Sequence, residues 1–132
     1  MAYLLDTSAY SHMVRGHVPV MELVRRADEI IVPSVVVAEL RFGFALGERQ
    51  EENELLLSRF LHDRRVAVVY PDELTTDAYL SVAVFARRHG KQLSQNDTWI
   101  AALAVRHDGV LVSYDRDFLG LSGLSGFQLE YL

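Results

Sequence analysis

The chain has 132 residues, a formal net charge of −5, and a composition that is 50% hydrophobic and 23% charged. This length and composition fit one globular domain, residues 1–132, with a core of its own, and the absence of cysteine excludes disulfides and thiolate zinc sites. The acidic balance argues against a protein that coats nucleic acid, because phosphate binding depends on basic surface.

Apolar runs of strand length alternate along the chain with longer segments of helical period. This alternation predicts an α/β domain with a mostly parallel central sheet of about five strands, flanked by helices. In chain order, the predicted strands are Ala2–Leu5, Glu29–Val32, Val66–Tyr70, Gly109–Ser113 and Phe127–Glu130, and the predicted helices are Ser8–Arg15, Val18–Ala27, Ser34–Leu46, Gln50–Asp63, Leu74–His89 and Asn96–His107.

Local signals support these boundaries. Pro33 stops a strand and offers Ser34 as a helix N-cap, and Pro71 precedes Asp72 in the same way. Gly90 is expected to end the helix that precedes it. The glycine-rich stretch 120–126 follows no strand-to-helix turn, so it predicts a tight loop and not a nucleotide-binding motif.

The N-terminal residues and the apolar runs bear on location. No basic flank precedes the short apolar run at the start, and no apolar stretch reaches membrane-spanning length. We therefore expect a cytoplasmic protein with no membrane segment.

Acidic residues follow two of the predicted strands. Asp6 comes directly after the first strand, while Asp115 and Asp117 come just after the fourth. Asp97 lies near the first turn of an apolar helix, where free N–H groups favour an anion. Ligands of open parallel sheets bind beyond the carboxyl ends of the strands, so these acids are candidate site residues.

Glu39 is the fourth candidate, in the stretch VVVAELRFGFAL. It is the only polar residue between Val35 and Leu40, so a helix here turns its acid towards apolar surface. An unpaired carboxylate in such a place is costly and needs compensation.

Each acid also has a purely structural interpretation, which stays open when that acid is taken by itself. Convergence of all of them on one edge of the sheet would favour a site. The structural alternatives are helix capping for Asp6 and Asp97, a turn for Asp115 and Asp117, and pairing with Arg41 or exposure to solvent for Glu39.

If the carboxylates do converge, their mutual repulsion calls for a hard divalent cation bound through oxygen. The sequence has no cysteine, and its histidines show no metal-ligand spacing, so Mg²⁺, with Mn²⁺ as a substitute, is expected in preference to zinc. These histidines are His12, His17, His62, His89 and His107.

Basic residues occur as adjacent pairs. Twelve of the thirteen basic residues are arginine, whose planar fork suits contact with phosphate. The pairs are either a local basic patch or solvated helix faces. They are Arg25-Arg26, Arg64-Arg65 and Arg87-Arg88, the last followed by His89 and Lys91.

Four motifs in this order resemble a PIN domain, and specifically the VapC-type toxins of bacterial toxin–antitoxin pairs. They are LLDTSAY near the start, VAELRFG in a helix after a strand, NDTWIAALA opening a late helix, and LVSYDRDF after the next strand. The resemblance covers nearly the whole chain, and the order and spacing of the motifs make it far more specific than any one of them.

The resemblance assigns roles to individual residues. It implies that the catalytic and metal-binding acids are Asp6, Glu39, Asp97 and Asp115, with Asp117 as an additional or substitute ligand. It also implies that Ser8 positions the first acid or a water, that Asn96 precedes the third acid as is common in the family, and that Ser113 stands where the family often has threonine. The stretch 48–77 carries no signature.

The resemblance further implies a Mg²⁺- or Mn²⁺-dependent endoribonuclease that cuts structured RNA, often transfer or ribosomal RNA, by attack of a metal-activated water. It implies a homodimer and a cognate VapB-type antitoxin, whose tail packs along an apolar groove and pushes a basic side chain into the acidic pocket. Phe42, Phe44 and Leu46 are candidates for the groove or the dimer interface, with core packing as the alternative.

Other classes of protein fit less well. A phosphatase of the haloacid-dehalogenase type needs a second aspartate where Ser8 stands. A receiver domain needs an acidic pair after the first strand and a lysine after a late strand, whereas Lys91 comes before the Asp97 helix. A PIN fold kept as an inactive binding scaffold is the remaining alternative.

Overall fold

Five parallel strands form the central sheet in the order β3-β2-β1-β4-β5, as described for residues 1–132 by a computed structural model. The predicted α/β class with a parallel sheet of five strands is therefore confirmed. The strands are β1 (Ala2–Leu5), β2 (Glu29–Pro33), β3 (Val66–Val69), β4 (Val110–Ser113) and β5 (Gln128–Tyr131).

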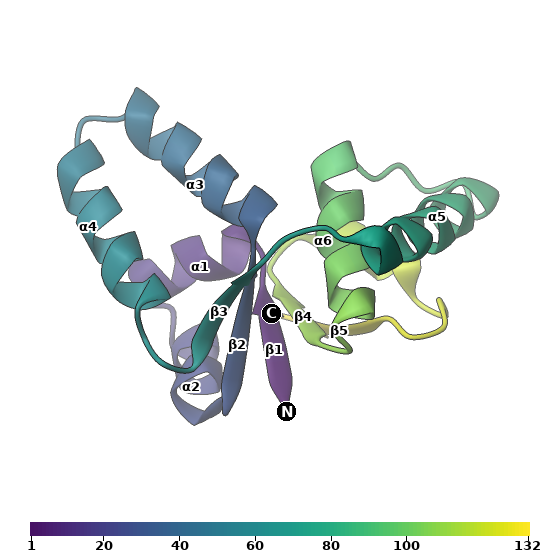
Figure 1. The fold of residues 1–132 in the computed structure, drawn as a ribbon, viewed down its shortest axis with the longest axis horizontal. Coiled ribbons are helices and arrows are strands. Elements are labelled where there is room, and N and C mark those ends of the chain that lie inside the picture. Colours follow the sequence, from purple (N-terminus) through teal and green to yellow (C-terminus); the bar gives the residue numbers. More distant parts are fainter.

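Helices lie on both sides of this sheet. Figure 1 shows α1 to α4 on one side of the strands and the α5–α6 pair on the other. The helices are α1 (Thr7–Val14), α2 (Val18–Arg26), α3 (Ser34–Leu46), α4 (Gln50–Leu61), α5 (Glu73–Arg88) and α6 (Gln95–Arg106), and a 3₁₀ helix η1 (Arg116–Leu121) precedes β5.

The strand order reverses next to β1. From β1 the chain crosses to β2 and then β3 on one side, and it returns past β1 to β4 and β5 on the other. Such a reversal opens a crevice beyond the carboxyl ends of the two strands that flank it. Here these strands are β1 and β4, which pair in register at Leu4 with Leu111 and at Leu5 with Val112.

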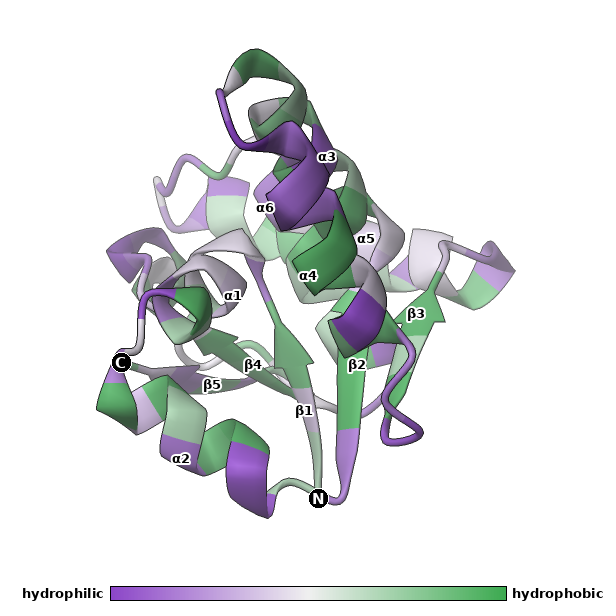
Figure 2. Cartoon of the chain, turned by 90° about the vertical axis from the view of Figure 1, so that its left-hand side faces the viewer, coloured by the Kyte–Doolittle hydropathy of each residue, from purple (hydrophilic) through white to green (hydrophobic).

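Burial explains why the two central strands read as continuous apolar runs. Leu4, Leu5 and Leu111 are fully buried, because helices cover both faces of the sheet. Figure 2 shows β1, β2 and β3 as mostly hydrophobic, whereas the surrounding helices alternate between hydrophilic and hydrophobic segments. No helix has both the length and the apolar character needed to cross a membrane.

Some local predictions are confirmed and others are wrong. Asp72 does cap α5, and Gly90 follows that helix with φ +65°, a conformation that favours glycine. The expected N-cap at Ser34 is wrong, because Ser34 is already the first residue of α3 and Pro33 occupies the cap position without a side-chain bond. The stretch 120–126 is only partly a loop, since its first two residues belong to η1.

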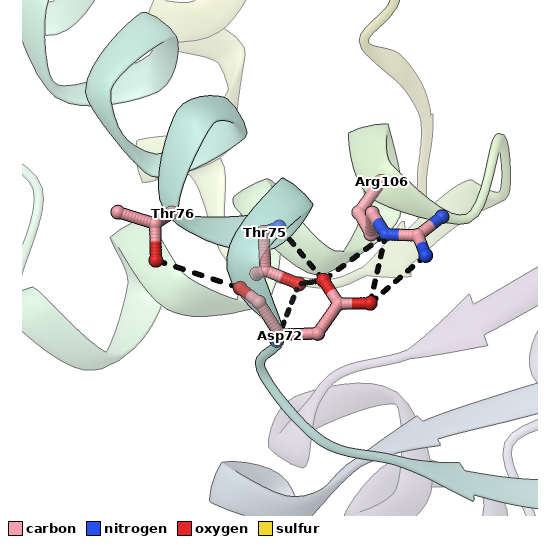
Figure 3. A network of polar contacts seen from close by, with 4 residues as sticks. All are labelled: Asp72, Thr75, Thr76 and Arg106. Carbon is pink, nitrogen blue, oxygen red and sulfur yellow. Dashed lines mark hydrogen bonds and ion pairs between the residues drawn. The ribbon is translucent and has the colours of Figure 1, made fainter.

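A polar network joins α5 to α6, the two helices between β3 and β4 (Figure 3). The Asp72 carboxylate accepts a hydrogen bond from the Thr75 backbone N–H at 2.9 Å, and the Asp72 N–H donates to Thr75 Oγ1 at 3.1 Å. Arg106, in the last turn of α6, donates to both carboxylate oxygens of Asp72, at 2.8 Å to Oδ2 and 3.1 Å to Oδ1. The Arg106 guanidinium and the Thr75 bonds hold the pKa of Asp72 well below its usual range.

Asp72→Ala should lower the thermal midpoint by about 5 °C, because it removes a helix cap and leaves Arg106 unpaired. Asp72→Asn should lose less, since asparagine still caps the helix. Differential scanning calorimetry at pH 7 measures both changes. The exposed Asp77 on the same helix provides the control, and an Asp77→Ala loss as large as that of Asp72→Ala would contradict a specific role for the network.

Candidate active site

A polar pocket of about 420 Å³ lies beyond the carboxyl ends of β1 and β4. Four of the predicted site acids line it, each from a different part of the chain. They are Asp6, Glu39, Asp97 and Asp115. The crevice expected from the strand order is thus an acidic pocket.

Asp6 both caps α1 and forms one wall of the pocket. Its Oδ1 accepts hydrogen bonds from the Ala9 backbone N–H at 2.8 Å and from Ser8 Oγ at 2.7 Å. Its Oδ2 accepts a short hydrogen bond from Ser113 Oγ. The side chain is 4% exposed, and burial raises the pKa of Asp6 despite these bonds, which act in the opposite direction. The capping and site interpretations of Asp6 are therefore compatible.

Two serine hydroxyls join the end of β1 to the end of β4. Ser113 Oγ accepts a bond from the Asp115 N–H at 2.9 Å while it donates to Asp6. Ser8 Oγ accepts a bond from the Tyr114 N–H at 3.0 Å while it donates to Asp6. Both hydroxyls therefore hold the Asp6 carboxylate in a fixed orientation against the start of the segment that carries Asp115.

Glu39 is held by two neutral donors. Thr7 Oγ1 donates to Glu39 Oε1 at 2.7 Å, and Asn96 Nδ2 donates to Glu39 Oε2 at 3.3 Å. The alternative pairing with Arg41 is wrong, because Arg41 binds Glu54 at 3.0 Å. Glu39 therefore has no cationic partner, and Thr7, which belongs to none of the predicted site positions, helps to hold its carboxylate in place.

Three carboxylates form a tighter group at the start of α6 and η1. One oxygen from each of Asp97, Asp115 and Asp117 lies within 4.8 Å of the others. Ser94 caps α6 by accepting a hydrogen bond from the Asp97 N–H at 3.1 Å, so the alternative interpretation of Asp97 as a helix cap is wrong. Asp115 accepts from the Asp117 N–H at 2.9 Å and so caps η1. Asp117 is exposed and does not line the pocket.

The electrostatics of the pocket favour a bound cation. Burial, and then the charges of Asp115, Glu39 and Asp6, raise the pKa of Asp97 to about 6. A carboxyl with such neighbours stays ionised at neutral pH only against repulsion, which a divalent ion would relieve. All four acids offer oxygen, the donor that Mg²⁺ and Mn²⁺ prefer, so the residues fit such an ion.

His12 also lines the pocket, although the spacing of the histidines gave no sign of this. Its Nδ1 lies 2.8 Å from the Ser8 carbonyl oxygen, and its ring stacks on Tyr114 with centroids 3.8 Å apart. The sequence predicts that His12 lies one helical turn after Ser8, but it does not predict that His12 stacks on Tyr114, the residue that follows β4. The remaining lining residues outside the predicted set are Thr7, Ser11, Arg15, Ser94 and Ile100.

The basic pairs differ in what they contact. Arg25 binds Glu22 at 2.7 Å, and Arg65 binds Asp63 together with the carbonyl oxygens of Val24 and Ala27. These two arginines therefore have local structural partners. The pair at residues 87 and 88 is exposed and forms no salt bridge.

An apolar groove of about 230 Å³ adjoins the acidic pocket, and the two share Ser11 and Arg15 as lining residues. Phe44 lines this groove, whereas Phe42 and Leu46 are 68% and 74% exposed. The alternative interpretation, that Phe42 and Leu46 pack in the core, is therefore wrong. The groove runs between α1, α3 and α4, and its apolar lining residues are Tyr10, Val14, Leu40, Phe44 and Leu56.

Comparison with protein families gives a match to the PIN domain over residues 3–124. Among curated proteins, ribonuclease VapC2 of Rickettsia felis is 26% identical over 117 residues, covering 86% of each chain. Toxin FitB of Neisseria gonorrhoeae is 29% identical over 126 residues, covering 85% of this chain and 86% of that protein.

Solved structures of similar fold include toxin–antitoxin complexes. VapBC-1 from nontypeable Haemophilus influenzae aligns with a TM-score of 0.83 and 24% identity, covering 99% of this chain and 98% of that one. VapBC2 from Rickettsia felis, bound to a DNA fragment from its promoter, aligns with a TM-score of 0.81 at the same identity and coverage. At this level of identity the alignments establish the fold.

The raised pKa of Asp97 predicts how the metal-free protein responds to pH. The usual pKa of aspartate is 3.8, and that of Asp97 in the folded protein is about 6. Between these two pH values, folded Asp97 keeps a proton that the unfolded chain has released, so the free energy of unfolding falls as pH rises. Asp97→Asn should flatten this part of the profile and raise stability at pH 7 by about 1 kcal/mol. The expected gain in stability is smaller than the pKa shift alone implies, for two reasons. Asp97 is partly exposed, and the Asp97→Asn variant loses the favourable interaction between the carboxylate and the helix dipole.

Urea unfolding in EDTA from pH 4 to pH 8 measures this profile. Asp77→Asn on the surface of α5 should leave it unchanged. A variant Asp97→Asn that is clearly less stable than the parent at pH 7 would instead make Asp97 a structural residue.

Proposed function

The chain belongs to the PIN domain family, and from this we propose that it is an endoribonuclease that acts as the toxin of a toxin–antitoxin pair. One observation carries the proposal: four acids from distant parts of the sequence line a single pocket at the carboxyl edge of the sheet. The names of the relatives, ribonuclease VapC2 and toxin FitB, support the same activity.

We propose that the acids of the pocket hold Mg²⁺, or Mn²⁺ in its place. Asp6, Glu39, Asp97 and Asp115 would provide the oxygen ligands, and Asp117 would add a ligand from the group that it forms with Asp97 and Asp115. When bound, such an ion offsets the negative charge of the site, orients a phosphate oxygen and lowers the pKa of a coordinated water.

The neutral residues around the acids preorganise the site. Ser8 and Ser113 fix the Asp6 carboxylate, and Thr7 and Asn96 fix that of Glu39. Carboxylates held in this way need little rearrangement when charge develops during the reaction, which is how preorganised polar groups contribute most to catalysis. Asn96 thus has a positioning role.

The proposed reaction is hydrolysis of a phosphodiester in structured RNA, with transfer or ribosomal RNA as the substrate class. Water attacks phosphorus, the bond to the 3′ oxygen breaks, and the products carry a 5′-phosphate and a 3′-hydroxyl. Because such RNA is cytoplasmic, we place the activity in the cytoplasm.

We propose a VapB-type antitoxin as the protein partner and a homodimer as the state of the toxin. The apolar groove between α1, α3 and α4 suits an amphipathic segment of the antitoxin. Since Ser11 and Arg15 line both the groove and the acidic pocket, a segment in the groove reaches the acids and can place a basic side chain among them. The similar folds solved as VapBC complexes support this kind of partner.

The competing classes lack a supporting contact. Ser8, which stands where the dehalogenase-type phosphatase needs an acid, is occupied in holding Asp6. Lys91, the only lysine, lines a different cavity from the one that contains Asp6, whereas a receiver domain needs both in one site. An inactive scaffold would have no need for four acids whose repulsion costs stability.

Asp6→Asn and Asp97→Asn should each lower the rate of RNA cleavage by at least about a hundredfold, the scale lost when one stabilising group is removed from an active site. Asparagine can still cap α1 at position 6, so the fold should persist. Gel analysis of total RNA incubated with purified protein in Mg²⁺ measures the cleavage, and Asp77→Asn is the control. Intact RNA at high excess of the unmodified protein would rule out the nuclease proposal.

Mg²⁺ should raise thermal stability, because an ion that binds only the folded chain adds about 1.4 kcal/mol at ten times its dissociation constant. Asp97→Asn should lose most of this gain, as should Glu39→Gln. Thermal unfolding with a series of Mg²⁺ concentrations measures the effect. Equal gains in the unmodified chain and in both variants would place the ion somewhere else.

A further inference from the structure

A second groove lies beside the acidic pocket, on the other side of the first turn of α6. Its volume is about 770 Å³, against about 420 Å³ for the pocket, and its walls come from α5, the α5–α6 connection and α6. Both volumes are of the size that binds small ligands and single groups of larger ones. None of the four pocket acids lines this groove.

The groove is basic, unlike the pocket. Arg87 and Lys91 line it, no acidic residue does, and neither of these basic residues forms a salt bridge. Two unpaired cations and no anion make a surface complementary to phosphate, even though the net charge of the chain is −5.

Packing against a glycine helps to fix the position of Lys91. A Cβ atom added to Gly120 would lie 3.0 Å from Lys91 Cγ and 3.2 Å from Cδ, so the lysine stem rests directly on this backbone. The absence of a side chain at Gly120 therefore lets the stem of Lys91 lie along η1, which limits the freedom of its ammonium group.

The other lining residues suit a nucleotide base. Tyr79 lines the groove and packs against Trp99, with ring centroids 4.3 Å apart and an angle of 44° between the rings. Gln92 and Gln95 add amide donors and acceptors that form no hydrogen bond within the protein. An aromatic ring, free amides and cations are the groups that proteins use to bind unstacked bases and their phosphates.

The groove and the acidic pocket meet at α6. Ser94 and Asp97 line the pocket, while Gln95 and Thr98 line the groove, so the two cavities flank one helical turn. A nucleic acid strand that crosses this turn can place one phosphate at the acids and an adjacent nucleotide in the groove.

We propose that the groove binds the unpaired RNA segment next to the scissile phosphate and so selects substrates that can extrude a nucleotide there. Arg87 and Lys91 contact the phosphates, Tyr79 stacks on a base, and the two glutamines read its edge. This inference rests on the proposed ribonuclease function, and it makes the groove a determinant of which RNA is cut.

Removing the Lys91 charge while keeping its stem tests the proposal. In the Asp97→Asn background, which prevents cleavage, Lys91→Met should raise the dissociation constant for a fluorescein-labelled transfer RNA pool about three- to tenfold in Mg²⁺. It should also reduce the slope of log Kd against log salt by about one, which a purely structural loss would not do. Fluorescence anisotropy at several salt concentrations measures both, and Lys91→Arg should restore binding.

Arg64→Gln is the matched control, because it removes one exposed charge just before β3, at the opposite edge of the sheet. The groove proposal would be overturned if the Lys91→Met and Arg87→Gln variants bound RNA as tightly as Arg64→Gln. It would also be overturned if the Asp97→Asn protein bound no RNA. Cleavage by the unmodified protein is measured separately on the same RNA. If the unmodified protein cleaves RNA but the groove variants bind it unchanged, only the groove proposal is overturned. If the unmodified protein does not cleave RNA, the ribonuclease proposal is overturned.

Discussion

Repulsion among carboxylates gathered at one edge of the sheet is the constraint on which the rest of this structure depends. Asp6 is almost fully buried, and burial with the charges of three neighbouring acids raises the pKa of Asp97 to about 6. A fold selected for stability alone would avoid such an arrangement. The presence of these clustered acids in a well-packed domain is the physical argument that they serve function. A divalent cation would offset their negative charge.

The surrounding structure limits the cost of this repulsion with neutral hydrogen bonds. Serine, threonine and asparagine side chains hold Asp6 and Glu39, and no arginine or lysine pairs with either of them. A cationic partner would stabilise the protein but would also compete with a metal ion. At the far end of α6, Arg106 binds Asp72 and fixes the helix whose first turn carries Asp97. Charge pairing is thus used where it steadies the scaffold and is absent from the pocket.

The acidic pocket lies between two surfaces of opposite character. The apolar groove of α1, α3 and α4 joins it on one side, and the basic groove of α5 and α6 lies across the first turn of α6. The two surfaces suit different partners, because one offers burial of apolar side chains and the other offers cations and an aromatic ring. Under the proposed function, a protein inhibitor would reach the acids from the apolar groove and an RNA strand would reach them from the basic groove. The basic groove would let a chain with net charge −5 bind the polyanion that the proposed function requires.

The sequence by itself determined the α/β class, the five strands to within one or two residues, and which four acids line the pocket at the carboxyl edge of the sheet. Strand and helix periods are local, and acids that follow buried parallel strands, as Asp6 and Asp115 do, must lie at the carboxyl edge of the sheet. The tertiary structure decided what depends on distant partners: that Ser94 and not Asp97 caps α6, that Glu39 binds Thr7 and Asn96 instead of Arg41, and that His12 stacks on Tyr114 beside the pocket. It also gave Arg25 and Arg65 structural partners and placed Arg87 and Lys91 in a groove. Most of these features depend on contacts between side chains that are far apart in the sequence. The spacing of residues along the chain does not encode such contacts.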